Sequence, residues 1–176
     1  MRLAIPSRRA TFARHVLPFA LIPPVMIVFA MRDHPEVYRL DPLAANWEWI
    51  ALLVFVTELA SVAVVAAMLR LTPPASAPRP TPDQAYRLAA RAAAPLWASA
   101  IVLALPSLAA LVATHLFAHA VSLRTLYRGV RTDLRVDGEI EALHVTYMTY
   151  SVPVVLWIPI LVIDRKSTRL NSSHAD

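Results

Sequence analysis

The chain has 176 residues, of which 57% are hydrophobic and only 16% are charged, and its formal net charge is +5. Soluble domains carry about 25% charged residues, so this composition indicates an integral membrane protein. Cysteine is absent and only two glycines occur, which excludes disulfides, thiolate chemistry and glycine-rich phosphate loops. The basic residues form short clusters between apolar runs, a pattern that orients a protein in a bilayer and does not indicate nucleic-acid binding.

The first apolar run covers residues 16–31. It follows four arginines with no acidic residue among them: Arg2, Arg8, Arg9 and Arg14. A basic start before an apolar run also suits a signal peptide. No small-residue cleavage site follows, however, because the polar string Arg32-Asp33-His34-Pro35 comes next. We therefore predict a retained first transmembrane helix.

The second apolar run, residues 47–69, contains one acidic residue, Glu58, and begins with Trp47 and Trp49. About 20 apolar residues cross the hydrocarbon core, and tryptophan favours the headgroup depth. This run therefore predicts a second span.

A linker of residues 71–82 follows, with five prolines among Thr, Ser and Ala. Such a composition links elements and does not pack. At its end Thr81 suits a helix N-cap, with Pro82 in the first turn and Gln84 reaching back in a capping box.

Residues 88–123 form an apolar stretch of 36 residues in which Arg91 is the only charge. A single tilted crossing uses at most about 25 residues, so the stretch must cross twice. Pro106-Ser107 lies near its middle and supplies the break, because proline removes a helical hydrogen bond and restricts the preceding residue. The predicted spans are residues 84–105 and 107–127.

A charged segment, residues 124–141, precedes a last apolar run over residues 142–163. The predicted fold class is therefore all-α: a polytopic bundle of five transmembrane helices in one domain, residues 1–163. With five spans, three segments share one side and carry four arginines each: the N-terminal segment, the segment from Arg70 to Arg91, and residues 124–141. The other side has only Arg32 and Arg39. The positive-inside rule then places the N-terminus in the cytoplasm.

The last thirteen residues, 164–176, differ abruptly in composition from the run before them. The string Asp164-Arg165-Lys166-Ser167-Thr168-Arg169-Leu170-Asn171-Ser172-Ser173-His174 resembles the translation of a common sequencing-library adapter. We interpret it as an artefactual tail that follows native sequence ending near Ile163, and we leave it out of fold and charge reasoning.

Three polar residues within the spans are candidates for function. Glu58 lies near the middle of its span, where an ionisable group is costly and is either functional or paired with a neighbouring helix. His115 and His119 are four residues apart and share a helix face, a spacing that suits a metal. No acidic partner stands at metalloprotease spacing, so hydrogen bonding between helices is the simpler interpretation. No metal or cofactor is predicted.

Arginines near the end of the fourth span form a second candidate set. Arg124, Arg128, Arg131 and Arg135 fall close to helical spacing. They either bind anionic lipid headgroups or anchor the helix at the interface. Small residues such as Ala90, Ala94 and Ala98 share one face of the third helix, which suits packing within one chain or a seam between two copies.

Several short motifs resemble those of a known family in order and spacing. They are His15-Val16-Leu17-Pro18 with Ala20-Leu21-Ile22-Pro23, Ala94-Pro95-Leu96, Pro106, and Leu126-Tyr127-Arg128-Gly129-Val130. Over most of residues 12–163 the chain resembles the Yip family, small five-helix proteins related to the Rab-interacting Golgi proteins, and in particular its bacterial inner-membrane relatives. The resemblance implies five spans, a cytoplasmic N-terminus and a non-enzymatic role. The acidic N-terminal motif of the eukaryotic members, which bind prenylated Rab GTPases, is absent here.

Two functional hypotheses follow. The first is a Yip-type scaffold or membrane-organising protein, with the lipid bilayer and a protein partner or second copy as partners, and it predicts no substrate-sized polar cavity. The second is a small transporter or channel subunit, and it predicts that Glu58, His115 and His119 meet at a wet midplane cavity. No paired carboxylates, Ser/His/Asp order or HExxH motif occurs, so we predict no enzymatic activity.

Overall fold

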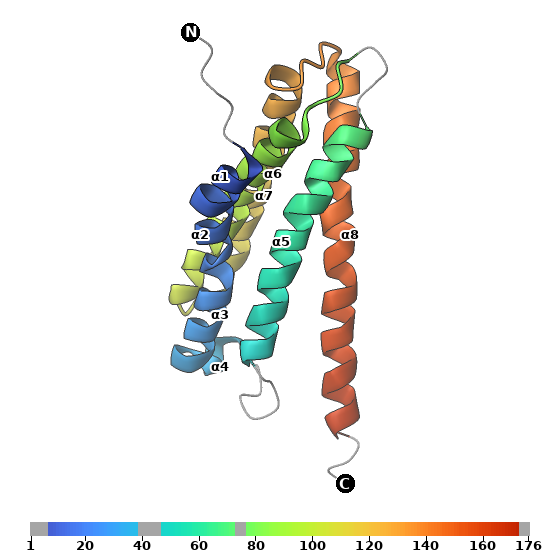
Figure 1. The fold of residues 1–176 in the computed structure, drawn as a ribbon. Coiled ribbons are helices and arrows are strands. Elements are labelled where there is room, and N and C mark those ends of the chain that lie inside the picture. Colours follow the sequence, from blue (N-terminus) through green and yellow to red (C-terminus); the bar gives the residue numbers. More distant parts are fainter. Residues whose placement is uncertain (1–6, 39–46, 73–76, 173–176) are drawn as a thin grey trace.

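The computed structural model describes residues 7–38, 47–72 and 77–172, with side chains through residue 155 except that of Tyr38. Every element in these ranges is a helix, and no strand occurs in them (Figure 1). Four helices are long and apolar enough to cross a membrane: Arg8–Asp33, Trp47–Leu71, Pro82–Ala104 and Leu108–Thr132. The all-α prediction is confirmed, and these helices support a multi-pass membrane protein.

The first helix starts at Arg8 and not at residue 16 as predicted. Its segments are α1 (Arg8–Thr11), the π-helix η1 (Phe12–Val16), α2 (Leu17–Ala20) and α3 (Ile22–Asp33), and a short helix α4 (Pro35–Tyr38) follows. Ser7 sets the start, since its hydroxyl accepts a hydrogen bond from the Ala10 amide at 3.3 Å and so caps α1. The wide turns of η1 come directly before Pro18, which has no amide hydrogen to continue an α-helical ladder.

The second helix, α5 (Trp47–Leu71), extends the predicted span by two residues, and α6 (Pro82–Ser99) follows the linker. The predicted capping box opens α6. The Thr81 hydroxyl accepts a hydrogen bond from the Gln84 amide at 3.3 Å, and the Gln84 side chain accepts one from the Thr81 amide at 2.9 Å.

The predicted break near Pro106 is confirmed. After α6 the chain tightens into the 3₁₀ helix η2 (Ala100–Ala104), and Leu105 is extended, as the residue before proline prefers. Ser107 then caps α7 (Leu108–Thr132), because its hydroxyl accepts a hydrogen bond from the Ala110 amide at 3.2 Å.

The helix α7 continues beyond residue 127, where the fourth span is predicted to end, and reaches Thr132. Arg131 lies at its carbonyl end, where a cation is favoured. The arginine series is therefore not uniform: three members lie on α7, whereas Arg135 lies beyond its end with a φ of 57°.

The fifth long helix, α8 (Glu139–Ser172), covers the predicted run of residues 142–163. Its backbone remains helical through Ser172, whereas residues 173–176 of the predicted tail lie outside the described residues.

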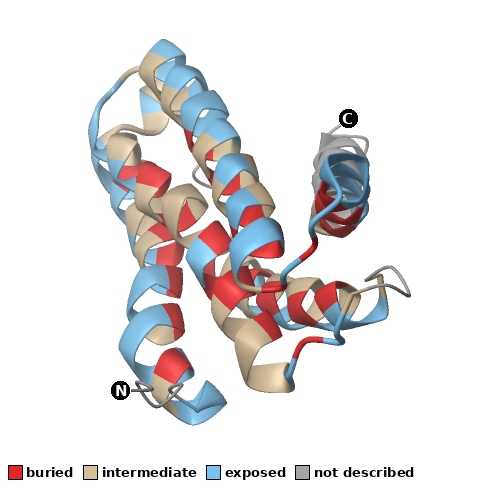
Figure 2. Ribbon diagram, turned by 90° about the horizontal axis from the view of Figure 1, so that it is seen from above, coloured by how far each residue is buried: buried red, intermediate tan, exposed pale blue. Residues whose placement is uncertain are grey.

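α6 lies at the centre of the bundle, with α5 and α7 packed against it. Figure 2 shows that buried residues of the helices face the interior of the bundle. Alanines dominate the buried face of α6, among them Ala85, Ala89 and Ala92, and small residues allow close backbone approach between membrane helices. Gly129 of α7 is one such contact, since a Cβ there would meet the Leu88 side chain at 2.0 Å.

The outer surface of the bundle is strongly apolar. Large side chains that are more than 60% exposed include Val25, Trp49, Leu116, Phe117 and Ile140. Water would not favour so large an exposed apolar surface, whereas lipid chains would.

Two ion pairs link helices at one end of the bundle. Arg8 contacts Asp83 at the start of α6 at 3.2 Å, and Arg91 contacts Asp133 just past α7 at 2.9 Å. The start of α6 and the connection between α7 and α8 lie at this end, whereas α4 and the start of α5 lie at the other (Figure 1). Three of the arginine-rich segments thus gather at a single end of the molecule.

Candidate functional site

A cavity of about 550 Å³ lies between the helices and opens to the surface of the bundle. Cavities of this size hold small organic molecules. Residues from α3, α5, α6, η2, α7 and α8 line it, and most of them are apolar. Its polar lining consists of Glu58, Ser61, His115, His119, Ser122 and Tyr150. The three residues singled out from the sequence therefore share one cavity.

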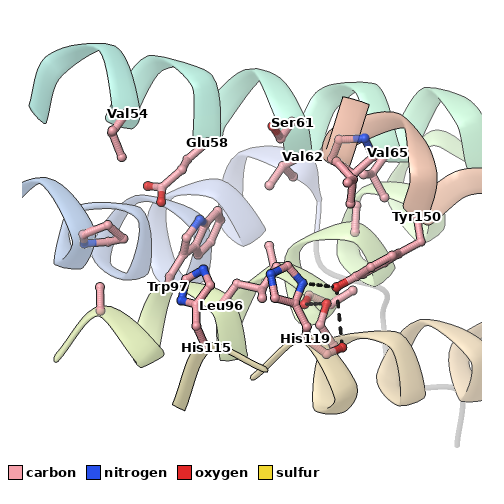
Figure 3. A pocket seen from close by; sticks show the side chains of 18 of the residues that line it. Val54, Glu58, Ser61, Val62, Val65, Leu96, Trp97, His115, His119 and Tyr150 are labelled. Atoms are coloured by element: carbon pink, nitrogen blue, oxygen red, sulfur yellow. Dashed lines mark hydrogen bonds between the residues drawn. The ribbon is translucent and has the colours of Figure 1, made fainter. Parts of the chain in front are cut away.

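Glu58 occupies the buried face of α5, together with Ala51, Val62 and Ala66 at helical spacing. The residue is only 8% exposed, and its Oε2 atom is buried with no hydrogen-bond partner among the described residues. Figure 3 shows its carboxyl group pointing from α5 toward Trp97 of α6, another lining residue. An unpaired buried carboxyl group is costly. The carboxyl group of Glu58 therefore indicates a functional role and not a contribution to stability.

His115 is held by a hydrogen bond to α6. Its Nδ1 lies 3.0 Å from the Ser99 hydroxyl, which itself donates to the Leu96 carbonyl at 2.6 Å. A serine hydroxyl has one hydrogen, so His115 Nδ1 must be the donor in this pair. In the neutral ring Nε2 then carries a lone pair and can accept a hydrogen bond. His115 is also exposed, so this acceptor can meet a ligand.

His119 is linked to α8 rather than to α6. Its Nδ1 lies 2.5 Å from the hydroxyl of Tyr150, and both side chains line the cavity (Figure 3). The rings of His115 and His119 meet edge to face with centroids 5.2 Å apart. The predicted hydrogen bonding between helices is therefore present at both histidines. Tyr150, the partner of His119, was not singled out from the sequence.

A metal centre finds no support in the described residues. They contain no group of three or more His, Asp or Glu side chains placed to hold a metal ion. Both histidines also use Nδ1 in hydrogen bonds to other helices. Their arrangement suits the recognition of a ligand better than the coordination of a metal.

The four arginines of the other candidate set lie away from the cavity. Arg124, Arg128, Arg131 and Arg135 are all exposed, and the cavity lining includes none of them. Exposure at a helix end suits either headgroup binding or interfacial anchoring. Both interpretations of this set remain predictions.

Sequence reasoning missed the aromatic part of the site. Trp97 is 4% exposed and Tyr150 half-buried, and both line the cavity. Each lies in an apolar run, where the sequence pattern indicates only that an aromatic side chain packs in the core. The available signal was their hydrogen-bonding groups, because an indole N–H or phenol O–H inside a bilayer needs a partner.

Comparisons with protein-family models, with curated proteins and with solved structures gave no match to this chain.

Proposed function

We propose that this chain is a five-helix membrane protein that binds a small, largely apolar molecule between its helices, as a small transporter does. The observation that carries this proposal is the convergence of Glu58 on α5 with His115 and His119 on α7 at one cavity of about 550 Å³. The transporter hypothesis expects this convergence at a wet cavity, whereas the scaffold hypothesis expects no substrate-sized polar cavity. The convergence favours the transporter hypothesis, and the mostly apolar lining indicates that the bound molecule is largely apolar. Discontinuous membrane helices around a midplane site are common in transporters, and η2 with the Pro106 break interrupts the bundle beside the cavity.

The proposal includes α8 as the fifth crossing, a cytoplasmic N-terminus and the bacterial inner membrane as the location. The helical backbone of α8 over the apolar run of residues 142–163 supports the fifth crossing, since about 20 residues are enough to cross a bilayer. The arginine-rich segments at one end support the orientation. The location and the Yip relationship rest on the sequence motifs alone.

Filling the cavity tests the proposed function. Ala93 on α6 lines the cavity and is half-buried, so Ala93→Phe should place a ring where the ligand would lie. The probe is N-phenyl-1-naphthylamine, a neutral apolar dye that fluoresces when it leaves water. We expect saturable binding to the purified chain in detergent, weakened at least tenfold by Ala93→Phe.

The matched control is Ala60→Phe, the same change at an exposed position of α5 that does not line the cavity. It should bind the dye as the wild type does. Circular dichroism and thermal unfolding would establish that both variants fold. Equal dye binding by wild type and a folded Ala93→Phe would contradict the proposal.

A further inference from the structure

The described lining of the cavity contains an acidic side chain but no lysine or arginine. Glu58 is the sole acidic or basic residue of its described lining, apart from the two histidines. Neither of the two ion pairs found among the described side chains involves it. A carboxyl group away from water either keeps its proton or needs a positive partner before it can ionise, and the described lining supplies no basic side chain besides the two histidines. A positively charged ligand can therefore provide the partner that Glu58 lacks.

The groups around Glu58 suit an organic cation. The side chain points toward Trp97 (Figure 3), and the face of an indole attracts a cation, most strongly when both are desolvated. His115 contributes an acceptor, because its Nδ1 hydrogen is used on Ser99. The remaining lining is mostly apolar, which suits the hydrocarbon body of a ligand and not a hydrated inorganic ion.

We propose that the cavity selects lipophilic organic cations, with the positive centre held between Glu58 and Trp97. This inference rests on the proposed function and adds the chemical class of the ligand to it. An anion of the same shape would be repelled by an ionised Glu58 and would gain no ion pair from a protonated one. A neutral apolar molecule would fill the cavity but leave Glu58 Oε2 without a partner.

Two ions of nearly identical shape and opposite charge test the inference. Tetraphenylphosphonium and tetraphenylborate share four phenyl groups around one central atom. Equilibrium dialysis of each against the purified full chain in an uncharged detergent should show the cation binding at least tenfold more tightly. In Glu58→Gln the carboxylate is lost while the shape is kept, so this preference should fall toward one.

The matched control is Glu48→Gln, which removes an exposed acidic residue from the first turn of the same helix. It should retain the full preference for the cation. If Glu58→Gln does not fold, Trp97→Leu provides a second test, because it removes the aromatic face and should weaken binding of the cation more than that of the anion.

The outcomes separate this inference from the proposed function. Equal binding of the two ions by the wild type, or an unchanged preference in a folded Glu58→Gln, would overturn the selection of cations. The cavity itself would still stand in that case if Ala93→Phe abolishes binding of the neutral dye. Failure of Ala93→Phe to affect the dye would instead overturn the proposed function and this inference together.

Discussion

At the scale of single residues, Glu58 carries the most information about function. It is buried near the middle of a long apolar helix, yet Oε2 has no partner among the described residues. By contrast, the neighbouring polar groups His115 and Ser122 are hydrogen-bonded to α6. Evolution of a purely structural bundle would favour an apolar residue at this position, because an unpaired buried polar group destabilises a fold.

The stability of a Glu58→Leu variant tests this interpretation. Leucine is similar in size and has no polar atom, so the free energy of unfolding should rise by about 1–3 kcal/mol. Thermal unfolding in detergent would show a higher melting temperature, while binding of organic cations is lost. Glu48→Leu, at an exposed site, serves as the control and should change the melting temperature little. A lower melting temperature for Glu58→Leu would show that the carboxyl group has a structural partner.

The chemistry of this site could be predicted from the sequence only in part. Glu58, His115 and His119 stand out because polar groups are rare within spans. That they meet at one cavity depends on how α5 and α7 pack against α6, which no local pattern encodes. The contacts of His115 with Ser99 and of His119 with Tyr150 join residues far apart in the chain.

At the scale of elements, local signals predicted boundaries well where a side chain determines them. The Thr81 capping box and the break at Pro106 both appear where expected. The first helix starts before its predicted span and α7 ends after its predicted span, because the length of an apolar run indicates the hydrocarbon thickness and a helix can continue beyond it. Ser7 and the arginines of α7 extend those helices beyond their apolar parts.

The arrangement of the elements in the membrane can be measured by labelling single cysteines, since the chain has none of its own. With five crossings and a cytoplasmic N-terminus, a membrane-impermeant maleimide should label cysteine at Leu43 and at Ser167 in intact cells. Cysteine at Ser76 and at Gly138 should react only after lysis. Leu43 and Ser76 lie outside the described residues, so this prediction rests on the charge pattern.

The same experiment reports separately on the orientation and on the number of crossings. Labelling of Ser76 from outside intact cells would reverse the proposed orientation. Protection of both Gly138 and Ser167 would show that α8 does not cross the membrane.

At the scale of the whole molecule, the bundle combines an apolar outer surface with a cavity between its helices. Alanine-rich packing and Gly129 bring α6 close to its neighbours at the end where the ion pairs lie. Exposed ion pairs such as Arg8 with Asp83 contribute only about 0–1 kcal/mol, so packing dominates the stability there. Residues of η2 and Pro153 on α8 line the cavity beside this packed region.

The most direct test of the account is whether a ligand enters this cavity and comes close to Trp97. In a variant that keeps Trp97 and replaces the other three tryptophans with phenylalanine, bound N-phenyl-1-naphthylamine should accept excitation energy from the indole. Binding in the cavity predicts energy transfer that saturates as the dye is added and that Ala93→Phe abolishes while the protein remains folded. Transfer that grows without saturation and is equal in the Ala93→Phe background would contradict it, because the dye would then be dissolved in the detergent around the helices.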